Sequence, residues 1–274
     1  MPELPEVETI KRGLEKKIVG KTLKNIEVLN PKSIQFDPKK VRAKKVLKVW
    51  RRAKMLGIDL FSDLTLLFYL KMTGQLIFID TENMFAQMPN KHTRATFHFT
   101  DGSTLYFNDQ IKFGWVKIIQ TSKIKDQKEL KNLGPEPLNK NFTWQILKNN
   151  LLEHKNMSVK PALMDQSVVG GVGNIYASEA LFLAKIDPRR SVKSLSDKEF
   201  KKLHKAILDV LKKGIKHRGA TVRNYVDAEG KKGEFLPFAS VYKRAGEPCK
   251  KCKAKIVRIN LGGRGTYLCP ICQK

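Results

Sequence analysis

The first six residues, Met1-Pro2-Glu3-Leu4-Pro5-Glu6, place a potential nucleophile beside two carboxylates. Because proline is small, we expect Met1 to be removed, which would leave the nitrogen of Pro2 as a free secondary amine. An α-amino group has a pKa of about 7.7–8.0, so its uncharged fraction could attack an electrophilic carbon and form an iminium. Glu3 and Glu6 could then handle protons. The same residues also suit the first turn of an ordinary helix, where prolines and acids are common.

Four cysteines near the C-terminus form a second group with possible chemistry. Cys249-x-x-Cys252 and Cys269-x-x-Cys272 are separated by sixteen residues, which is typical of a zinc ion held by four thiolates. Four thiolates leave no open coordination position, so this zinc would be structural. A pair of disulfides is the alternative, and the lack of a secretion signal argues against it.

Two glycine-containing stretches could bind phosphate. A hairpin tip is expected at Asn260-Leu261-Gly262-Gly263-Arg264-Gly265-Thr266, where Arg264 could reach a phosphate group. Gly170-Gly171-Val172-Gly173-Asn174 precedes a predicted helix, so backbone N–H groups and Asn174 could do the same. An ordinary solvated turn and a simple helix cap are the alternatives at these two places.

The composition favours a polyanionic partner. The 274 residues contain 53 Lys and Arg against 26 Asp and Glu, which gives a formal net charge of +27 and a pI near 10.0. An excess of this size fits binding to a phosphate backbone, and such binding should weaken steeply with salt. Since the chain has no apolar stretch long enough for a membrane span and no signal-peptide core, we expect a cytoplasmic protein without a membrane partner.

The elements that must position these groups fall into two halves. In the first half, Val7, Ile10, Leu14 and Ile18 predict a helix that ends near Gly20. After it, short alternating strands separated by turns are expected. These strands cover residues 23–28, 65–70, 75–79, 95–99, 104–107 and 115–119. They should form a two-sheet β-sandwich or a barrel, with the helix packed against it.

The second half is predicted to be helical. After a turn-rich linker, helices are expected over residues 142–154, 175–185 and 196–217, and the last begins with a capping box at Ser196 and Glu199. The expected fold class is therefore α+β. The expected parts are an N-terminal catalytic β-sandwich domain at 1–131, a helical domain at 132–221, and a loop with the four-cysteine zinc finger at 222–274.

Three motifs together resemble those of the formamidopyrimidine-DNA glycosylases, bacterial enzymes that remove oxidised purines. They are the opening Met-Pro-Glu-Leu-Pro-Glu-Val-Glu-Thr, the Gly-Val-Gly-Asn-Ile-Tyr before a predicted helix, and the Gly-Arg-Gly-Thr hairpin tip. The resemblance spans essentially the whole chain. It implies a β-sandwich with an N-terminal helix, then a helix–two-turn–helix domain with a C-terminal zinc-ribbon hairpin. It also implies one structural Zn2+, a partner in double-stranded DNA with damaged bases, and a monomer associated with the bacterial nucleoid.

The resemblance implies a bifunctional DNA glycosylase and AP lyase of base excision repair. Pro2 would attack C1′ of a flipped 8-oxoguanine or formamidopyrimidine nucleotide, displace the base, and form a Schiff base that breaks down by β- and δ-elimination. Glu3 would move the protons, and Glu6 would orient the amine or the lesion. Lys54, expected to lie on a strand, would contact the phosphates beside the damaged nucleotide.

Other positions match family residues that contact DNA or fill the space left by the flipped base. Residues expected to contact DNA are His92, Lys112, Lys160, Asn174 and Arg264. Residues expected to fill the void are Met72, Ile111 and Phe113. The polar segment Arg223–Ser240 is expected to be a flexible loop that closes over the flipped base.

Two positions depart from the family pattern. Ile111 stands where the family has an arginine that recognises the cytosine opposite the lesion, and isoleucine donates no hydrogen bond, so opposite-base preference is in question. Lys112 is adjacent, but as a strand neighbour it is expected to point to the other face. Arg94 stands where the family often has a second histidine, and it is expected to keep a phosphate donor.

Two other functions stay open on the sequence alone. An endonuclease VIII-like enzyme would use the same N-terminal proline on oxidised pyrimidines, although Leu4 favours the purine branch because the other branch usually has glycine there. A noncatalytic zinc-ribbon DNA-binding protein is the alternative outside enzymes. The departure at Ile111 favours it, and the intact Pro2, Glu3, Lys54 and Asn174 argue against it.

Overall fold

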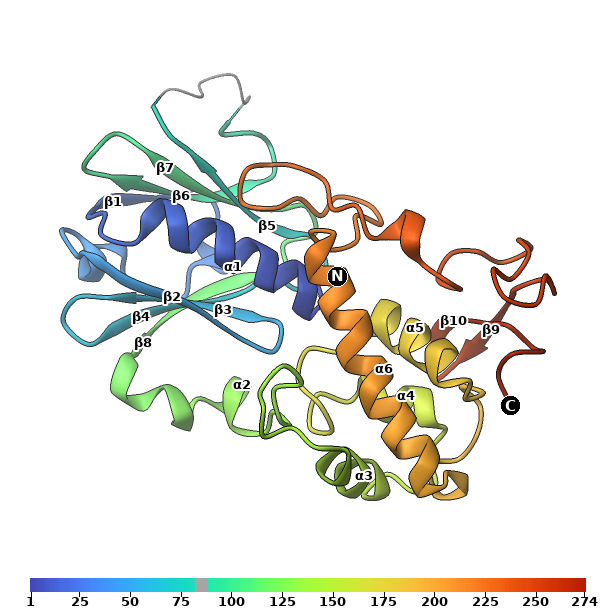
Figure 1. Ribbon diagram of the computed structural model, residues 1–274. Helices are drawn as coiled ribbons and strands as arrows, with labels where there is room; N and C mark the ends of the chain where they lie inside the picture. The colour runs from blue at the N-terminus through green and yellow to red at the C-terminus, as the bar shows by residue number, and fades with distance from the viewer. Residues whose placement is uncertain (82–87) are drawn as a thin grey trace. The chain divides into compact units, whose positions relative to one another are not determined.

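The structure is a computed structural model that describes residues 1–81 and 88–274 (Figure 1). The chain forms two compact units. The N-terminal unit comprises Met1–Lys131 and His217–Glu234, and the C-terminal unit comprises Asn132–Lys216 and Phe235–Lys274. The segment 217–234 therefore packs with the N-terminal unit although it follows the helices in sequence. The three-part division expected from the sequence stays a prediction.

Helix α1, which spans Leu4–Ile18, begins the N-terminal unit. Its apolar residues lie on one buried face, as their spacing predicts, and pack mainly against strand β2. The helix starts earlier than the apolar repeat alone indicates, because Glu3 takes the N-cap position and Pro5 lies in the first turn, where the missing N–H of proline is harmless. This packing fixes the position of the N-terminus.

Among the described residues, the N-terminal unit has two antiparallel four-stranded sheets, with strand orders β1-β6-β7-β5 and β2-β3-β4-β8. The strands are β1 Leu23–Val28, β2 Val46–Arg52, β3 Met55–Leu60, β4 Leu64–Tyr69, β5 Gly74–Ile79, β6 Thr93–Phe99, β7 Thr104–Asp109 and β8 Trp115–Gln120. Short helices of the same unit are η1 Pro31–Ser33, η2 Pro38–Val41, η3 Thr121–Asp126 and α2 Lys128–Lys131.

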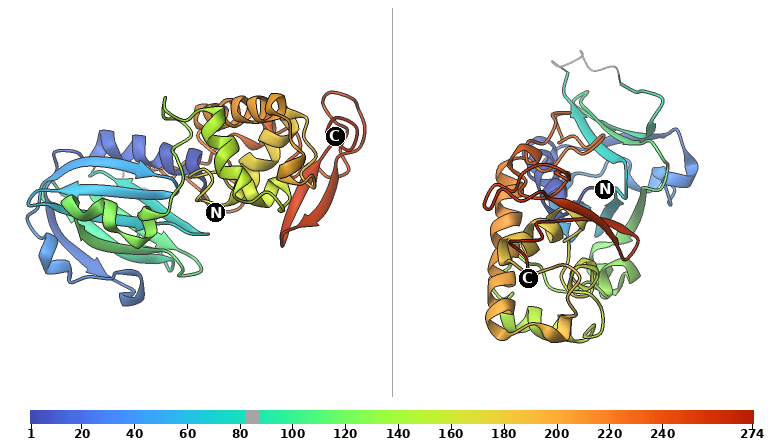
Figure 2. Two further views of the ribbon diagram at one scale, coloured as in Figure 1. Left: turned by 90° about the horizontal axis from the view of Figure 1, so that it is seen from below. Right: turned by 90° about the vertical axis from the view of Figure 1, so that its right-hand side faces the viewer.

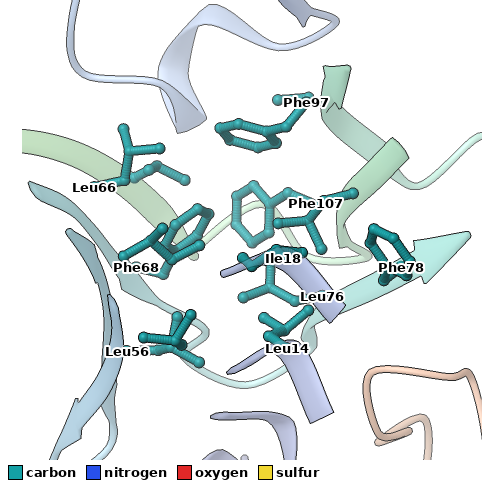
Figure 3. Packing of buried hydrophobic residues seen from close by; sticks show 14 of the residues in the cluster. Leu14, Ile18, Leu56, Leu66, Phe68, Leu76, Phe78, Phe97 and Phe107 are labelled. Carbon is teal, nitrogen blue, oxygen red and sulfur yellow. The ribbon is translucent and has the colours of Figure 1, made fainter. Parts of the chain in front are cut away.

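The two sheets enclose a hydrophobic core, part of which is shown in Figure 3. The ring centroid of Phe68, from the second sheet, lies 5.6 Å from that of Phe97 and 6.1 Å from that of Phe107, both from the first sheet. Leu14 and Ile18 of α1 join the same cluster. Burial of these large side chains stabilises the sandwich and confirms the predicted packing of the helix against two sheets.

Two differences from the sequence-based expectations concern candidate site residues. Lys54 lies in the turn between β2 and β3, and not on a strand, because Ala53 adopts a left-handed conformation with a φ of 51°. Residues 110–114 form a turn after β7, so the strand alternation expected to direct Lys112 away does not apply. Lys112 has a φ of 60° and is exposed.

The C-terminal unit contains the predicted helices and three short ones that were not predicted, α4, η4 and η5. Its helices are α3 Trp144–Leu152, α4 Val159–Met164, α5 Asn174–Ala184, η4 Val192–Ser194, α6 Asp197–Lys216 and η5 Leu236–Phe238. The capping box is present, because the N–H of Ser196 donates to Oε2 of Glu199 at 2.8 Å and the N–H of Glu199 donates to Oγ of Ser196 at 3.4 Å. Local sequence signals thus located the main helices of this unit.

Strands β9 Val257–Leu261 and β10 Arg264–Leu268 form an antiparallel hairpin in the C-terminal unit, drawn in red in Figure 2. Its tip consists of Gly262 and Gly263, whose φ angles of 56° and 70° suit glycine. A Cβ at Gly262 would lie 3.0 Å from Pro161, so the hairpin rests against α4. No helix of residues 1–81 and 88–274 is long and apolar enough to cross a membrane.

Candidate active site and nucleic-acid interface

The N-terminus lies among buried charged side chains of the N-terminal unit. Glu3, Glu6 and Lys54 are 3%, 1% and 5% exposed. The pKa of the Met1 amino group is lowered, chiefly because burial disfavours the charged ammonium. The positive charges of Lys54 and Arg223 lower this pKa further, while Glu3 and Glu6 oppose the shift. A lowered pKa increases the uncharged, nucleophilic fraction of an amine near neutral pH.

Glu6 connects the start of α1 to a segment far away in the sequence. Its Oε2 accepts the backbone N–H of Glu3 at 2.8 Å, and its Oε1 accepts the backbone N–H of Ala220 at 2.7 Å. A side chain at Gly219 would not fit, because its Cβ would lie 2.7 Å from Oε1 of Glu6. The carboxylate of Glu6 is therefore held in one orientation by two backbone donors.

The segment 217–234 is anchored to the sandwich along part of its length. Tyr225 and Ala228 belong to the hydrophobic core, and the carbonyl of Ala228 accepts a backbone N–H from β5 at 2.8 Å. The carboxylate of Asp227 accepts two backbone N–H groups from the tip that follows it, at 3.0 and 2.9 Å. Only residues 229–232 form an exposed run. The part of the predicted loop Arg223–Ser240 that lies in this segment therefore has buried anchors and an internally bonded tip.

Lys54 is positioned through contacts between its turn and α1. Nε of Arg51 donates to Oε2 of Glu8 at 2.9 Å, and Nη1 of Arg51 donates to the carbonyl of Ala53 at 3.0 Å. The side chain of Arg51 is 7% exposed, so solvent screens this ion pair less than a surface pair. Helix α1 thus positions both the N-terminus and the Lys54 turn. No local signal in the sequence distinguishes Glu8 and Arg51 from surface charges.

The three expected void-filling residues lie on two turns of the N-terminal unit. Met72 lies in the β4–β5 turn, whereas Ile111 and Phe113 lie in the β7–β8 turn. Their exposed fractions are 42%, 41% and 67%. Apolar side chains this exposed, gathered on neighbouring turns, are unusual unless they meet another molecule.

The expected DNA contacts of the N-terminal unit differ in exposure. Lys112 is exposed and His92 is half-buried. Arg94, expected from its sequence context to donate to phosphate, is instead buried. Its Nε donates to the carbonyl of Asp109 at 2.8 Å, and its Nη1 donates to the carbonyl of Lys91 at 3.4 Å. Arg94 therefore supports the backbone next to the β7–β8 turn.

Lys160 is a buried cation in the C-terminal unit. It is 1% exposed, and its Nζ donates to Oδ1 of Asn174 at 2.5 Å and to Oγ1 of Thr266 at 2.7 Å. Nδ2 of Asn174 donates to the carbonyl of Gly265 at 3.1 Å. These bonds join the start of α5 to β10, which begins at the exposed Arg264. Two expected phosphate contacts, Asn174 and Arg264, are thereby brought together around a buried lysine.

The four cysteines form a cluster that fits one zinc ion. Their sulfur atoms all lie within 4.8 Å of one another. Sulfur atoms around tetrahedral zinc, with Zn–S bonds of about 2.3 Å, are about 3.8 Å apart. The observed Sγ distances are 3.9 Å between Cys249 and Cys272 and 3.4 Å between Cys252 and Cys269. Because four thiolates complete the coordination, such an ion would stabilise the hairpin and would not activate a substrate.

Three parts of the chain match known protein families. Residues 1–116 match the formamidopyrimidine-DNA glycosylase N-terminal domain, and residues 133–226 match the formamidopyrimidine-DNA glycosylase H2TH domain. Residues 246–274 match a zinc finger found in FPG and IleRS. The third match contains all four clustered cysteines and supports one structural zinc ion.

Similarity to individual proteins extends over the full length. The formamidopyrimidine-DNA glycosylases of Pelotomaculum thermopropionicum and Streptococcus thermophilus are 41% and 40% identical, over 100% of this chain and 99% and 100% of those proteins. Lactococcus lactis Fpg, solved with DNA containing an abasic site, has a TM-score of 0.91 and 34% identity over 99% of each chain. MutM bound to DNA with carbocyclic 8-oxo-G has a TM-score of 0.90 and 34% identity over 100% of each chain.

Proposed function

This chain belongs to the formamidopyrimidine-DNA glycosylase family, and we propose that it is a bifunctional DNA glycosylase and AP lyase that removes oxidised purines in base excision repair. Its substrate would be double-stranded DNA that contains 8-oxoguanine or a formamidopyrimidine. The observation that carries this proposal is the N-terminus, where Pro2 lies beside the buried carboxylates of Glu3 and Glu6, and where the charge of Lys54 acts on the adjacent Met1 amino group.

The proposed reaction begins after Met1 has been removed. The secondary amine of Pro2 attacks C1′ of the flipped nucleotide, and the base leaves with the electrons of the glycosidic bond and takes up a proton. Opening of the sugar gives a Schiff base, and β- and δ-elimination then leave a one-nucleotide gap. Glu3 moves the protons, and Glu6, fixed by its bond to Ala220, orients the amine or the lesion.

We assign the remaining roles by position and charge. Phosphate contacts are assigned to Lys54, His92, Lys112, Asn174 and Arg264. Lys160, which is buried, would act mainly by supporting Asn174 and β10. Void filling is assigned to Met72, Ile111 and Phe113. The protein would work as a monomer at the nucleoid in the bacterial cytoplasm, and its net charge of +27 supports attraction to DNA.

Borohydride trapping tests the proposed nucleophile. Protein mixed with an 8-oxoguanine:cytosine duplex and reduced should give a covalent adduct whose modified peptide maps to residue 2. Pro2→Gly should trap much less DNA, whereas Pro5→Gly, a change at the proline in the first turn of α1, should still trap. Intact mass should show that Met1 is absent.

Other outcomes separate the alternatives. An adduct with an oxidised pyrimidine, and none with 8-oxoguanine, would place the enzyme with the endonuclease VIII-like proteins. DNA binding without an adduct on 8-oxoguanine, oxidised pyrimidine or abasic duplexes would leave a noncatalytic zinc-ribbon binder. A mature protein that retains Met1 would exclude Pro2 as the nucleophile.

A further inference from the structure

Two turns meet at one corner of the β-sandwich because of how the strands pair. The β4–β5 turn and the β7–β8 turn each cross from one four-stranded sheet to the other. Tyr69 at the end of β4 pairs with Trp115 at the start of β8. Gly74 at the start of β5 pairs with Asp109 at the end of β7. The two turns therefore leave and enter the sheets at the same places and lie side by side.

A buried carboxylate joins these turns. Asp109 is 0% exposed, and its Oδ2 accepts the backbone N–H of Gly114 at 2.6 Å. Its Oδ1 accepts the hydroxyl of Thr73 from the other turn. Oγ1 of Thr73 in turn accepts the backbone N–H of Ile111 at 3.1 Å. We call these three hydrogen bonds, centred on Asp109 and Thr73, the corner clamp.

The surroundings of the corner clamp leave little room for movement. A Cβ at Gly114 would lie 3.1 Å from Oδ2 of Asp109, so the turn passes close to the carboxylate. Nε of Arg94 donates to the carbonyl of Asp109 at 2.8 Å. The carbonyl of Thr73 accepts Nδ2 of Asn224 at 3.3 Å, which connects the clamp to the segment 217–234. Buried polar groups that are bonded on several sides specify one local conformation.

The corner clamp holds apolar side chains in contact with solvent. Met72 is on one clamped turn, and Ile111 and Phe113 are on the other. Holding such side chains rigidly does not help the fold, because it exposes apolar surface to water. It does help insertion into another molecule, because less side-chain and loop freedom is then lost on binding.

We propose that Asp109 and Thr73 are positioning residues that hold Met72, Ile111 and Phe113 as a preformed wedge for the DNA duplex. This inference rests on the proposed function. Asp109 is fully buried and would act only through the turns that it joins. A wedge assists the step in which a paired base leaves the stack, so its loss should matter most for a paired lesion. It should matter less for an abasic site, where no base has to be extruded.

Thr73→Val tests this inference, because valine keeps the shape of threonine and removes the hydroxyl. We expect kcat/KM on an 8-oxoguanine:cytosine duplex to fall about tenfold, while cleavage of an abasic-site duplex falls less than about twofold. Thr73→Ser, which keeps the hydroxyl, should restore the ratio of the two rates. Thr65→Val is the matched control: the hydroxyl of Thr65 donates to Asp59 at 2.7 Å elsewhere in the same unit. It should lower both rates equally or neither.

Amide hydrogen exchange in the DNA-free protein gives an independent readout. The N–H groups of Ile111 and Gly114 should exchange about tenfold faster in Thr73→Val and in Asp109→Asn, but not in Thr65→Val. Unchanged exchange at both amides, or an equal loss of activity on both duplexes, would overturn the inference. If the unmodified protein cleaved neither duplex, the proposed function would fail, and the exchange rates would still decide whether the clamp orders the turns.

Discussion

The β7–β8 turn and the tip of the β9–β10 hairpin are both exposed and both contain left-handed backbone. Lys112 in the first has a φ of 60°, and Gly262 and Gly263 in the second have φ angles of 56° and 70°. The β7–β8 turn presents apolar side chains, whereas the hairpin presents Arg264. Their supports also differ. The β7–β8 turn connects two four-stranded sheets and is held by the corner clamp. The hairpin has only two strands, which are too few to be stable alone.

The difference indicates how each exposed group is kept in place. Through Tyr267, the hairpin packs against a small hydrophobic cluster that includes Phe182, Val241 and Ile256 together with two of the cysteines, so it has little core of its own. A metal site and the buried Lys160 can supply the missing support. The β7–β8 turn draws its support from a large core and needs only a few hydrogen bonds. The two turns are both exposed, but loss of the metal site should affect the hairpin and loss of the corner clamp should affect the β7–β8 turn.

Removal of zinc should have the largest effect and should act on the hairpin alone. A chelator, or Cys272→Ser, should weaken binding to an abasic-analogue duplex about a hundredfold, because the strand that begins at Arg264 loses its support. Fluorescence anisotropy at fixed salt would measure the affinity. Arg264→Gln is the matched control, since it removes the charge and keeps the four thiolates.

Hydrogen exchange completes this comparison. The amides of Ile111 and Gly114 should keep their protection after chelation, because their partners lie in the N-terminal unit. Loss of protection at these amides, or full DNA affinity in the chelated protein, would contradict the separate support of the two turns.

Lys160→Met should have a smaller effect on the same hairpin. Methionine fills the space but leaves Oδ1 of Asn174 and Oγ1 of Thr266 without the ammonium donor, so we expect about tenfold weaker DNA binding. The salt dependence distinguishes support from direct contact. A residue that contacts phosphate should lower the slope of log K against log salt by about 0.9 when removed, whereas a buried support should change it much less.

The exposed Lys198 on α6 provides the control for a lost charge. Lys198→Met should leave the affinity nearly unchanged. A full decrease in the salt slope for Lys160→Met would mean that Lys160 reaches the DNA itself.

Local sequence signals predicted the C-terminal unit better than the strands of the N-terminal unit. The capping box at Ser196 and the paired cysteines depend on residues a few positions apart, so their spacing alone indicates the structure. Lys54 was expected to lie within a strand, whereas β2 and β3 are two strands joined by a turn at residues 53–54 that carries no Gly, Asn or Asp signal. Ala53 makes the left-handed turn there, which displaced Lys54 from its expected strand.

The parts of the candidate site that the sequence did not predict depend on contacts between segments that are far apart in the chain. The bond between Glu6 and Ala220 joins residues 214 positions apart, and no local pattern marks either partner. The corner clamp likewise joins Thr73 to Asp109 through strand pairing. Residue types and family motifs therefore indicated which side chains could react or bind, and the sheet topology determined which other residues hold them.

Ile111→Arg should have the smallest effect, and it tests whether the β7–β8 turn can recognise the base opposite the lesion. The backbone N–H of Ile111 bonds to Thr73, but its side chain is exposed, so the substitution should leave the corner clamp intact. An arginine there could donate hydrogen bonds to the cytosine opposite the lesion and should raise the cleavage ratio of 8-oxoguanine:cytosine over 8-oxoguanine:adenine about fivefold. Single-turnover rates on four duplexes that differ only in the opposite base would measure it.

Lys112→Met is the informative companion to this variant, because Lys112 lies in the same turn, is exposed, and is not directed away by strand alternation. If Lys112 contacts only phosphate, its loss should weaken binding to all four duplexes equally. A selective loss on the cytosine duplex would instead mean that Lys112 recognises the opposite base in place of the missing arginine. Equal ratios on all four duplexes for the unmodified protein and Ile111→Arg would show that this turn fills space without reading the opposite strand.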